Sequence, residues 1–102
     1  MRVIWSHRAY DNYQIVKRYI KRKFGERKVR EFCSEIRKAT VQISNHPDRG
    51  SYEPLLEGGS YAYRSILING LSKLVYVAED DMINVVDFWD CRWEPERITE
   101  GL

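Results

Sequence analysis

The sequence predicts one α+β domain, in which an N-terminal strand precedes an antiparallel two-helix hairpin that packs on a mostly antiparallel sheet. Three observations predict this fold. Apolar residues recur every three or four positions over residues 9–43, the period falls to two beyond residue 60, and Asn69-Gly70 marks a tight turn between two alternating stretches. We expect residues 1–102 to form a single domain of order β-α-α-β-β-β, with a three-stranded C-terminal meander and then a short helix or tail.

A short strand and a long helix open the chain. Residues 2–5 are predicted to form the strand, and Ser6 is predicted to cap the helix because its hydroxyl can accept from an unpaired amide of the first turn. Gly25 tolerates a positive φ, so the helix is predicted to end there. The apolar side of this helix consists of Ala9, Tyr13, Val16, Ile20 and Phe24.

A second helix is predicted to follow directly and to end at Asn45-His46-Pro47. Because the connection is so short, the two helices should form an antiparallel hairpin. The apolar stripe of the second helix consists of Val29, Phe32, Cys33, Ile36, Thr40 and Ile43.

The C-terminal half is predicted to be a loop followed by the meander. Residues 48–60 hold Gly50, Pro54, Gly58 and Gly59, which is typical of a loop. The strands are predicted at residues 61–68, 72–78 and 82–89. Glu94-Pro95-Glu96 is typical of a helix start with proline in the first turn.

Composition narrows the class of protein. Hydrophobic residues make up 43% and aromatic residues 13%, which is typical of a globular chain. No apolar run has the length of a membrane span and no signal peptide is recognisable, so we expect a cytoplasmic protein with no membrane partner. Cys33 and Cys91 have no metal-ligand spacing, and we interpret them as structural thiols, with neither metal nor cofactor.

Charge is divided unevenly along the chain. Residues 1–50 carry 13 Lys and Arg against 5 Asp and Glu, whereas residues 51–102 carry 4 against 10. The basic half could face nucleic acid or an acidic peptide; the alternative is a solvated helix end whose cations favour the helix dipole. The densest cations are Lys17, Arg18, Lys21, Arg22, Lys23, Arg27, Lys28 and Arg30.

Five stretches, taken together, resemble the RelE/ParE superfamily of bacterial toxins. They are Val3-Ile4-Trp5-Ser6 with Ala9; Asn45-His46-Pro47 leading to Gly50; Tyr63-Arg64-Ser65; Lys73-Leu74-Val75-Tyr76; and Val86-Asp87-Phe88-Trp89-Asp90-Cys91-Arg92 before Pro95. The resemblance extends over the whole chain. It implies the toxin of a type II toxin–antitoxin pair, held inactive by a cognate antitoxin that lays a helical or extended segment over it.

Two activities are known on this fold. RelE-like toxins enter the ribosome and cut mRNA, whereas ParE-like toxins inhibit DNA gyrase without a known hydrolytic site. The resemblance therefore implies either ribosome and mRNA, or DNA gyrase, as the target. Our first hypothesis is a RelE-like endoribonuclease, the alternative is a ParE-like gyrase inhibitor, and the third is an inactive member that binds only an antitoxin.

RelE-like cleavage requires cations that hold RNA in line while the 2′-hydroxyl attacks the adjacent phosphate. Arg64, Lys73 and Arg92 are the only Lys or Arg between positions 51 and 96, and three adjacent strands could bring them together as a phosphate cradle. The alternative is that each is solvated or paired with a carboxylate. No histidine is predicted nearby, since His7 and His46 fall at helix ends, and this favours a binding toxin.

Other residues have supporting roles in this prediction. Asp90 is a candidate general base if its surroundings raise its pKa; otherwise Asp87 and Asp90 are ion-pair partners of Arg92. Trp93 is expected to contact RNA or antitoxin, or to cover the end of the sheet. The hairpin cations are predicted to dock ribosomal RNA phosphates or an acidic antitoxin segment.

Overall fold

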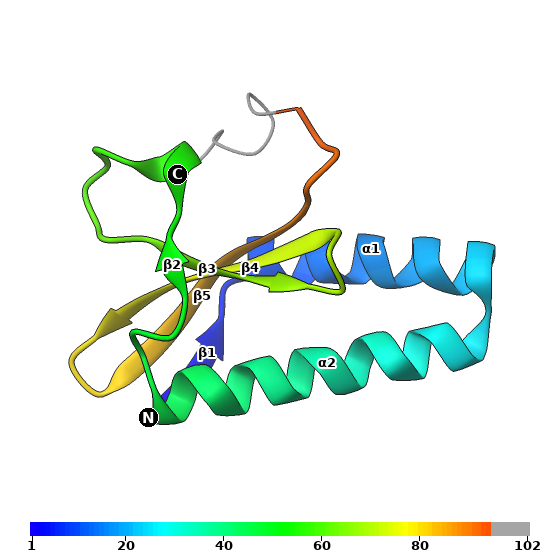
Figure 1. The fold of residues 1–102 in the computed structure, drawn as a ribbon, viewed down its shortest axis with the longest axis horizontal. Coiled ribbons are helices and arrows are strands. Elements are labelled where there is room, and N and C mark those ends of the chain that lie inside the picture. Colours follow the sequence, from blue (N-terminus) through cyan, green and yellow to red (C-terminus); the bar gives the residue numbers. More distant parts are fainter. Residues whose placement is uncertain (95–102) are drawn as a thin grey trace.

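The computed structural model describes residues 1–94, and its elements follow the predicted order (Figure 1). The elements are β1 (Arg2–Trp5), α1 (His7–Phe24), α2 (Glu26–Asn45), β2 (Ser51–Tyr52), the single 3-10 turn η1 (Pro54–Leu56), β3 (Arg64–Ile68), β4 (Ser72–Glu79) and β5 (Met82–Asp90). The helix or tail predicted from Pro95 onward lies outside the described residues. No helix in the described range is long and apolar enough to cross a membrane.

The five strands form one open sheet in the order β1-β5-β4-β3-β2. Strand β1 runs parallel to β5, and the other neighbours are antiparallel. The two helices pack as an antiparallel hairpin against the sheet, and the tip of the hairpin projects beyond it (Figure 1). The α+β prediction is therefore confirmed.

Local signals at the helix ends act as predicted. The Ser6 hydroxyl accepts from the amide of Ala9 at 3.0 Å and so caps α1. Gly25 has a φ of 92°, and its amide donates to the Lys21 carbonyl as the chain turns into α2. Helix α2 ends at Asn45, as the Asn45-His46-Pro47 signal predicts.

The core lies between the hairpin and one face of the sheet. The helices contribute Ala9, Val16, Ile20, Phe32, Ile36, Ala39 and Ile43, and the strands contribute Ile68, Leu74, Tyr76, Ile83, Val85 and Phe88. Two residues of the predicted apolar sides do not belong to the core. Thr40 is only half-buried, and its neighbour Ala39 is buried instead. Phe24 is 56% exposed. It is the last residue of α1, where the hairpin has already passed the edge of the sheet (Figure 1).

Two predicted boundaries in the C-terminal half are also wrong. Strand β3 begins at Arg64 and not at residue 61, and the predicted loop contains β2 and η1. Short side-chain and backbone bonds around Glu53 order this segment, and they join residues that are distant in sequence. A period-based prediction has no access to such contacts.

A β-bulge lies between β4 and β5. Val75 pairs with Asp87 and Tyr76 pairs with Val85, so Val86 is the extra residue. The bulge lets Val85 and Phe88 both face the helices. On the opposite face, Val75 and Trp89 form a small second cluster, against which Leu56, Tyr63, Val86 and Trp93 pack.

Candidate functional site

Arg64 lies at the end of the sheet near the end of α2. Its guanidinium donates to the backbone carbonyls of Gly50 at 2.6 Å and Asp48 at 3.2 Å, and it stacks on the Tyr52 ring at 4.2 Å. Side chains alternate along a strand, and Ile66 and Ile68 pack under the helices. Arg64 therefore belongs to the helix-covered face of the sheet.

Lys73 lies on the other face. Its ammonium group donates to Glu53 Oε1 at 2.6 Å, and the Glu53 side chain is fully buried. Glu53 also accepts from the Ser65 hydroxyl and the Leu55 amide, both at 2.9 Å. Burial alone would raise the pKa of Glu53, but the bonds from Lys73, Leu55 and Ser65 outweigh it and lower that pKa.

The three predicted cations do not come together. Arg64 and Lys73 occupy opposite faces of the sheet, because Arg64 pairs with Tyr76, three residues along β4 from Lys73. Arg64 pairs with Tyr76, and Tyr76 pairs with Val85 of β5. Arg92 lies beyond the end of β5, which places its backbone more than about 13 Å from Val85 along the strand direction. The prediction of a shared phosphate cradle is therefore wrong.

Arg92 instead joins Asp90 and α1. Its guanidinium donates to both Asp90 carboxylate oxygens, with the shortest contact 2.5 Å, and lies 5.4 Å from the centre of the Tyr19 ring. The hydrogen bond from Arg92 outweighs burial and lowers the pKa of Asp90, and Asp90 in turn raises the pKa of Arg92. A general base would need the opposite shift, so the condition set for that role is not met.

Asp87, the other predicted partner of Arg92, is engaged elsewhere. It is buried and accepts from Arg8 Nε at 3.0 Å and Asn12 Nδ2 at 2.9 Å, which ties α1 to β5. Sequence reasoning missed this contact. The available signal was the four-residue spacing of Arg8 and Asn12, which places both side chains on one side of the helix.

An open cationic cleft of about 490 Å³ lies between α1 and the residues that follow β5. Its cations are Arg18, Arg22 and Arg92, and its acid is Asp90, which Arg92 already pairs. We call this region the α1 cleft; its lining is Ile15, Val16, Arg18, Tyr19, Arg22, Asp90, Arg92 and Trp93. The structure thus brings Arg92 and Trp93 together with the hairpin cations, which the sequence had suggested only as separate groups.

Tyr19 is the centre of the α1 cleft. The guanidinium of Arg22 and the ammonium of Lys23 lie 5.9 and 5.7 Å from its ring centre, in addition to Arg92. The nearby cations, Lys23 first and then Arg92, lower the pKa of its hydroxyl. An aromatic ring among three cations is suited to bind a planar or anionic group.

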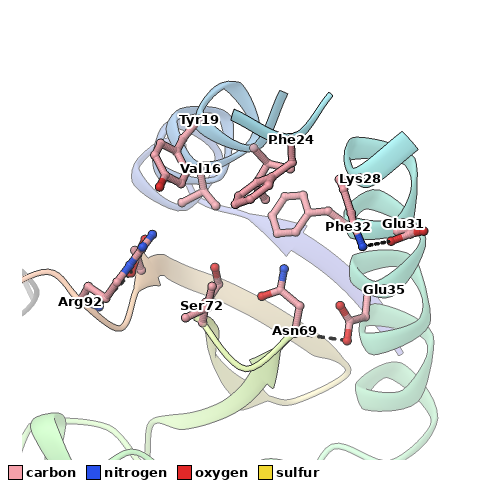
Figure 2. A pocket seen from close by; sticks show the side chains of 13 residues that line it. Val16, Tyr19, Phe24, Lys28, Glu31, Phe32, Glu35, Asn69, Ser72 and Arg92 are labelled. Atoms are coloured by element: carbon pink, nitrogen blue, oxygen red, sulfur yellow. Dashed lines mark hydrogen bonds and ion pairs between the residues drawn. The ribbon is translucent and has the colours of Figure 1, made fainter. Parts of the chain in front are cut away.

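A second, more apolar groove of about 240 Å³ continues from the cleft beneath the hairpin (Figure 2). Phe24 and Phe32 face each other across its upper part, and Arg92 lies at its other end (Figure 2). Two contacts stabilise its rim. Lys28 pairs with Glu31 at 3.3 Å, and the backbone amide of Asn69 donates to the Glu35 carboxylate at 3.2 Å. We call it the hairpin groove.

The remaining predicted hairpin cations lie along the two helices, most of them near the tip. Lys21 pairs with Glu26 at 3.4 Å and Arg27 with Glu31 at 3.6 Å, all of them well exposed. Lys17 lies 5.9 Å from the Tyr13 ring, and Arg30 is exposed on α2. Such solvated pairs contribute little stability, so most of the positive field remains available to a partner.

The cysteines differ from each other. Cys33 is half-buried and lies 3.3 Å from the Tyr13 hydroxyl, whereas Cys91 is exposed, so the structural interpretation is wrong for Cys91. Burial of part of the group nevertheless raises the pKa of the Cys91 thiol. In residues 1–94 no three His, Cys, Asp or Glu side chains gather as metal ligands would.

Comparison with solved structures relates this fold to known proteins. The chain is similar to one described as a chromosomal ParDE TA system from P. aeruginosa, with a TM-score of 0.69 and 11% identity over 88% of this chain and 95% of that one. It is also similar to a YoeB/ParE toxin from Agrobacterium tumefaciens, with a TM-score of 0.63 and 19% identity over 88% and 98%. No family model and no curated protein sequence matches. The fold predicted by the resemblance is thereby confirmed: the chain has the fold of the ParE and YoeB toxins.

Proposed function

We propose that this chain is the toxin component of a type II toxin–antitoxin pair. The observation that carries the proposal is the shared fold, which extends over 88% of this chain and nearly all of both neighbours. Those neighbours are described as a ParDE TA system and a YoeB/ParE toxin. The sequence stretches that resemble the RelE/ParE superfamily support the same assignment independently.

The hairpin groove is the proposed seat of the antitoxin. Its apolar lining, with Ile20, Phe24 and Phe32, suits the apolar side of a helical or extended segment. Lys28 and Arg92 at its two ends are already paired with Glu31 and Asp90, so apolar contacts would supply most of the binding within the groove. Lys21, Arg22, Lys23 and Arg27 around the tip would speed the encounter with an acidic partner.

We propose further that the toxin acts by binding its target, as ParE-like toxins do, with DNA gyrase as the target implied by that resemblance. The separation of Arg64, Lys73 and Arg92 supports this, because each is held by its own partners. The α1 cleft is the proposed target surface, with Arg18, Arg22 and Arg92 as its cations.

RelE-like cleavage of mRNA is the second candidate. The α1 cleft favours it, because Tyr19 and Trp93 could stack on a base while the arginines bind phosphates. On this hypothesis Arg92 acts on the phosphate without Arg64 or Lys73.

The two candidates predict different first effects of expression. The chain is induced in cells with and without the adjacent open reading frame, and labelled methionine and thymidine are followed over the first minutes. Prompt loss of thymidine incorporation, with protein synthesis continuing, supports the binding toxin. Prompt loss of methionine incorporation, with new mRNA ends in primer extension, supports RelE-like cleavage. Unchanged growth in the absence of any antitoxin contradicts the toxin assignment itself.

Variants refine this test. The binding proposal expects Arg64→Ala and Lys73→Ala to alter toxicity only as far as they alter the folded fraction, measured by circular dichroism. Arg92→Ala, at the cleft, should abolish arrest while the protein remains folded. One result would contradict this argument: RelE-like cleavage that is lost in all three variants while each remains folded. The distance between the three cations would then be no evidence against catalysis.

A further inference from the structure

A third pocket lies beside β2. Strand β2 lies at the end of the molecule away from the hairpin tip (Figure 1). The pocket measures about 320 Å³ and is formed where η1 and the residues before β3 face each other. Three tyrosines are among the residues that line it, Tyr52, Tyr61 and Tyr63, although the ring of Tyr52 lies against Arg64. We call it the tyrosine pocket. It shares no lining residue with the α1 cleft or the hairpin groove.

Two of the tyrosines that line this pocket are largely exposed to solvent. Tyr52 is 65% exposed and Tyr61 is 55% exposed, which are high values for large aromatic side chains. Tyr61 and Tyr63 meet nearly edge to face, with 6.0 Å between ring centres and 74° between planes. The rings of Tyr61 and Tyr63 therefore present walls at an angle to one another.

The pocket is held in place before any partner arrives. The Glu53 amide donates to the Tyr63 carbonyl at 2.9 Å, and the Leu56 amide donates to the Glu53 carbonyl at 3.1 Å. Below them the buried Glu53 carboxylate is bound to Lys73. Leu56 and Tyr63 pack on the second cluster, that of Val75 and Trp89, on the face of the sheet away from the helices. A wall fixed in this way loses little conformational entropy on binding.

The charge around the pocket selects the kind of partner. Its lining contains Glu53 and Glu57 and neither Lys nor Arg among the described residues. Glu53 is neutralised by Lys73, whereas Glu57 is exposed at the rim. Aromatic faces beside a carboxylate attract a cation and repel a phosphate. On the other face of the sheet, Arg64 shows that a guanidinium can stack on a tyrosine of this segment, because it lies 4.2 Å from the centre of the Tyr52 ring.

We propose that the tyrosine pocket binds an arginine or lysine side chain presented by a basic segment of a partner protein. The cation lies against the rings of Tyr61 and Tyr63, and Glu57 pairs with it at the rim. Glu57 gives the rim of the pocket a negative charge, whereas the cationic hairpin projects at the opposite end of the molecule (Figure 1). The proposal holds whether or not the chain is a toxin.

Short peptides test the proposal directly. An acetylated and amidated Gly-Ser-Arg-Ser-Gly peptide is titrated into the whole chain, and the ring protons of the tyrosines are followed by NMR. The arginine peptide should shift Tyr61 and Tyr63 saturably and bind at least about tenfold more tightly than the same peptide with neutral citrulline. Equal binding of the citrulline peptide overturns the proposal.

Variants locate the binding. Tyr61→Leu keeps an apolar side chain but removes the aromatic face, and should weaken arginine-peptide binding about tenfold; Glu57→Gln should weaken it about threefold. Tyr10→Leu, at a 51% exposed tyrosine on α1, should leave binding unchanged. Dispersed spectra establish that each variant is folded.

Other occupants have distinct outcomes, and each one contradicts the proposal. A proline-rich peptide without cations that binds as well as the arginine peptide would make the pocket a polyproline site. An oligonucleotide that shifts the same rings would make it a nucleic-acid site. Shifts that depend on protein concentration in the absence of peptide would make it a contact between two copies of this chain.

Discussion

Gly50 is required by the space around it and not by its backbone angles. A Cβ at this position would lie 2.8 Å from the Ser65 carbonyl oxygen and 2.9 Å from the Tyr76 ring. The Gly50 amide donates to the Tyr76 hydroxyl at 2.9 Å, and that hydroxyl donates to the Pro47 carbonyl at 2.7 Å. One buried tyrosine thus ties the end of α2 to the start of β2.

Substituting Gly50 tests this arrangement. Gly50→Ala should lower the free energy of unfolding by about 2 kcal/mol, because neither the Ser65 carbonyl nor the buried ring can withdraw cheaply. Urea unfolding followed by circular dichroism gives the value. Ser51→Ala, at the exposed neighbouring position, is the control and should change it by less than about 0.5 kcal/mol. Equal effects of the two substitutions would contradict the crowding argument.

At single positions, the sequence indicates which residues are chemically unusual, but it rarely indicates which residues they contact. The sequence alone indicates that Lys73 and Arg92 are unusual cations in an acidic half. It gives no means of pairing Lys73 with Glu53, because the two residues lie 20 positions apart and meet only when η1 folds over the outer face of the sheet. Arg92 and Asp90 are two positions apart, and their pairing was predictable as an alternative.

At the scale of elements, η1 depends on one carboxylate. Glu53 precedes the 3-10 turn and caps it, because its carboxylate accepts from the Leu55 amide. The same carboxylate also accepts from Lys73 and Ser65 of the sheet. Because these bonds hold the pKa of Glu53 below its ordinary value of 4.5, the ionised form stabilises the folded state. This contribution is complete above the unfolded-state pKa and is lost as the pH falls through the lower folded-state pKa.

The Glu53→Gln variant measures this contribution. At pH 7 it should unfold with a free energy lower by about 2 kcal/mol, since Lys73 loses its charged partner. The difference from the unsubstituted chain should shrink as the pH is lowered from 5 to about 3. Thermal unfolding across this range is the measurement, with Glu57→Gln at the exposed rim as the control. A difference that stays constant down to pH 3 would show that the carboxylate charge is not the cause.

The elements differ in how far the sequence determines them. The helices were predictable because local signals agree: the period of the apolar residues, Ser6 at one end and Gly25 at the turn. The two-residue strand β2 was not, because it exists only through pairing with β3. The bulge at Val86 escaped for the same reason, since it depends on the register of two strands and not on the pattern within one.

At the scale of the whole molecule, positive and negative charge are separated along the long axis. The cationic hairpin projects at one end of a molecule 38 Å long, and the β4–β5 turn, with Asp80 and Asp81, lies towards the other (Figure 1). The sequence showed the imbalance between the two halves, but not that Arg92 and Trp93 of the acidic half would join the basic one. That follows from the packing of α1 on β5, which brings the end of β5 beside Tyr19.

If the α1 cleft is the target surface, its charge should matter more than the charge of the hairpin as a whole. The double variant Arg18→Gln/Arg22→Gln removes two cleft cations from exposed positions, so it should unfold within about 0.5 kcal/mol of the unsubstituted chain. It should nevertheless lose growth arrest on induction at equal expression. Arg37→Gln/Lys38→Gln removes the same charge from exposed positions on α2 outside the cleft, and should leave arrest intact. Equal loss in both double variants would assign toxicity to the overall positive field, because a field acts through net charge, whereas a cleft acts through the place of each charge.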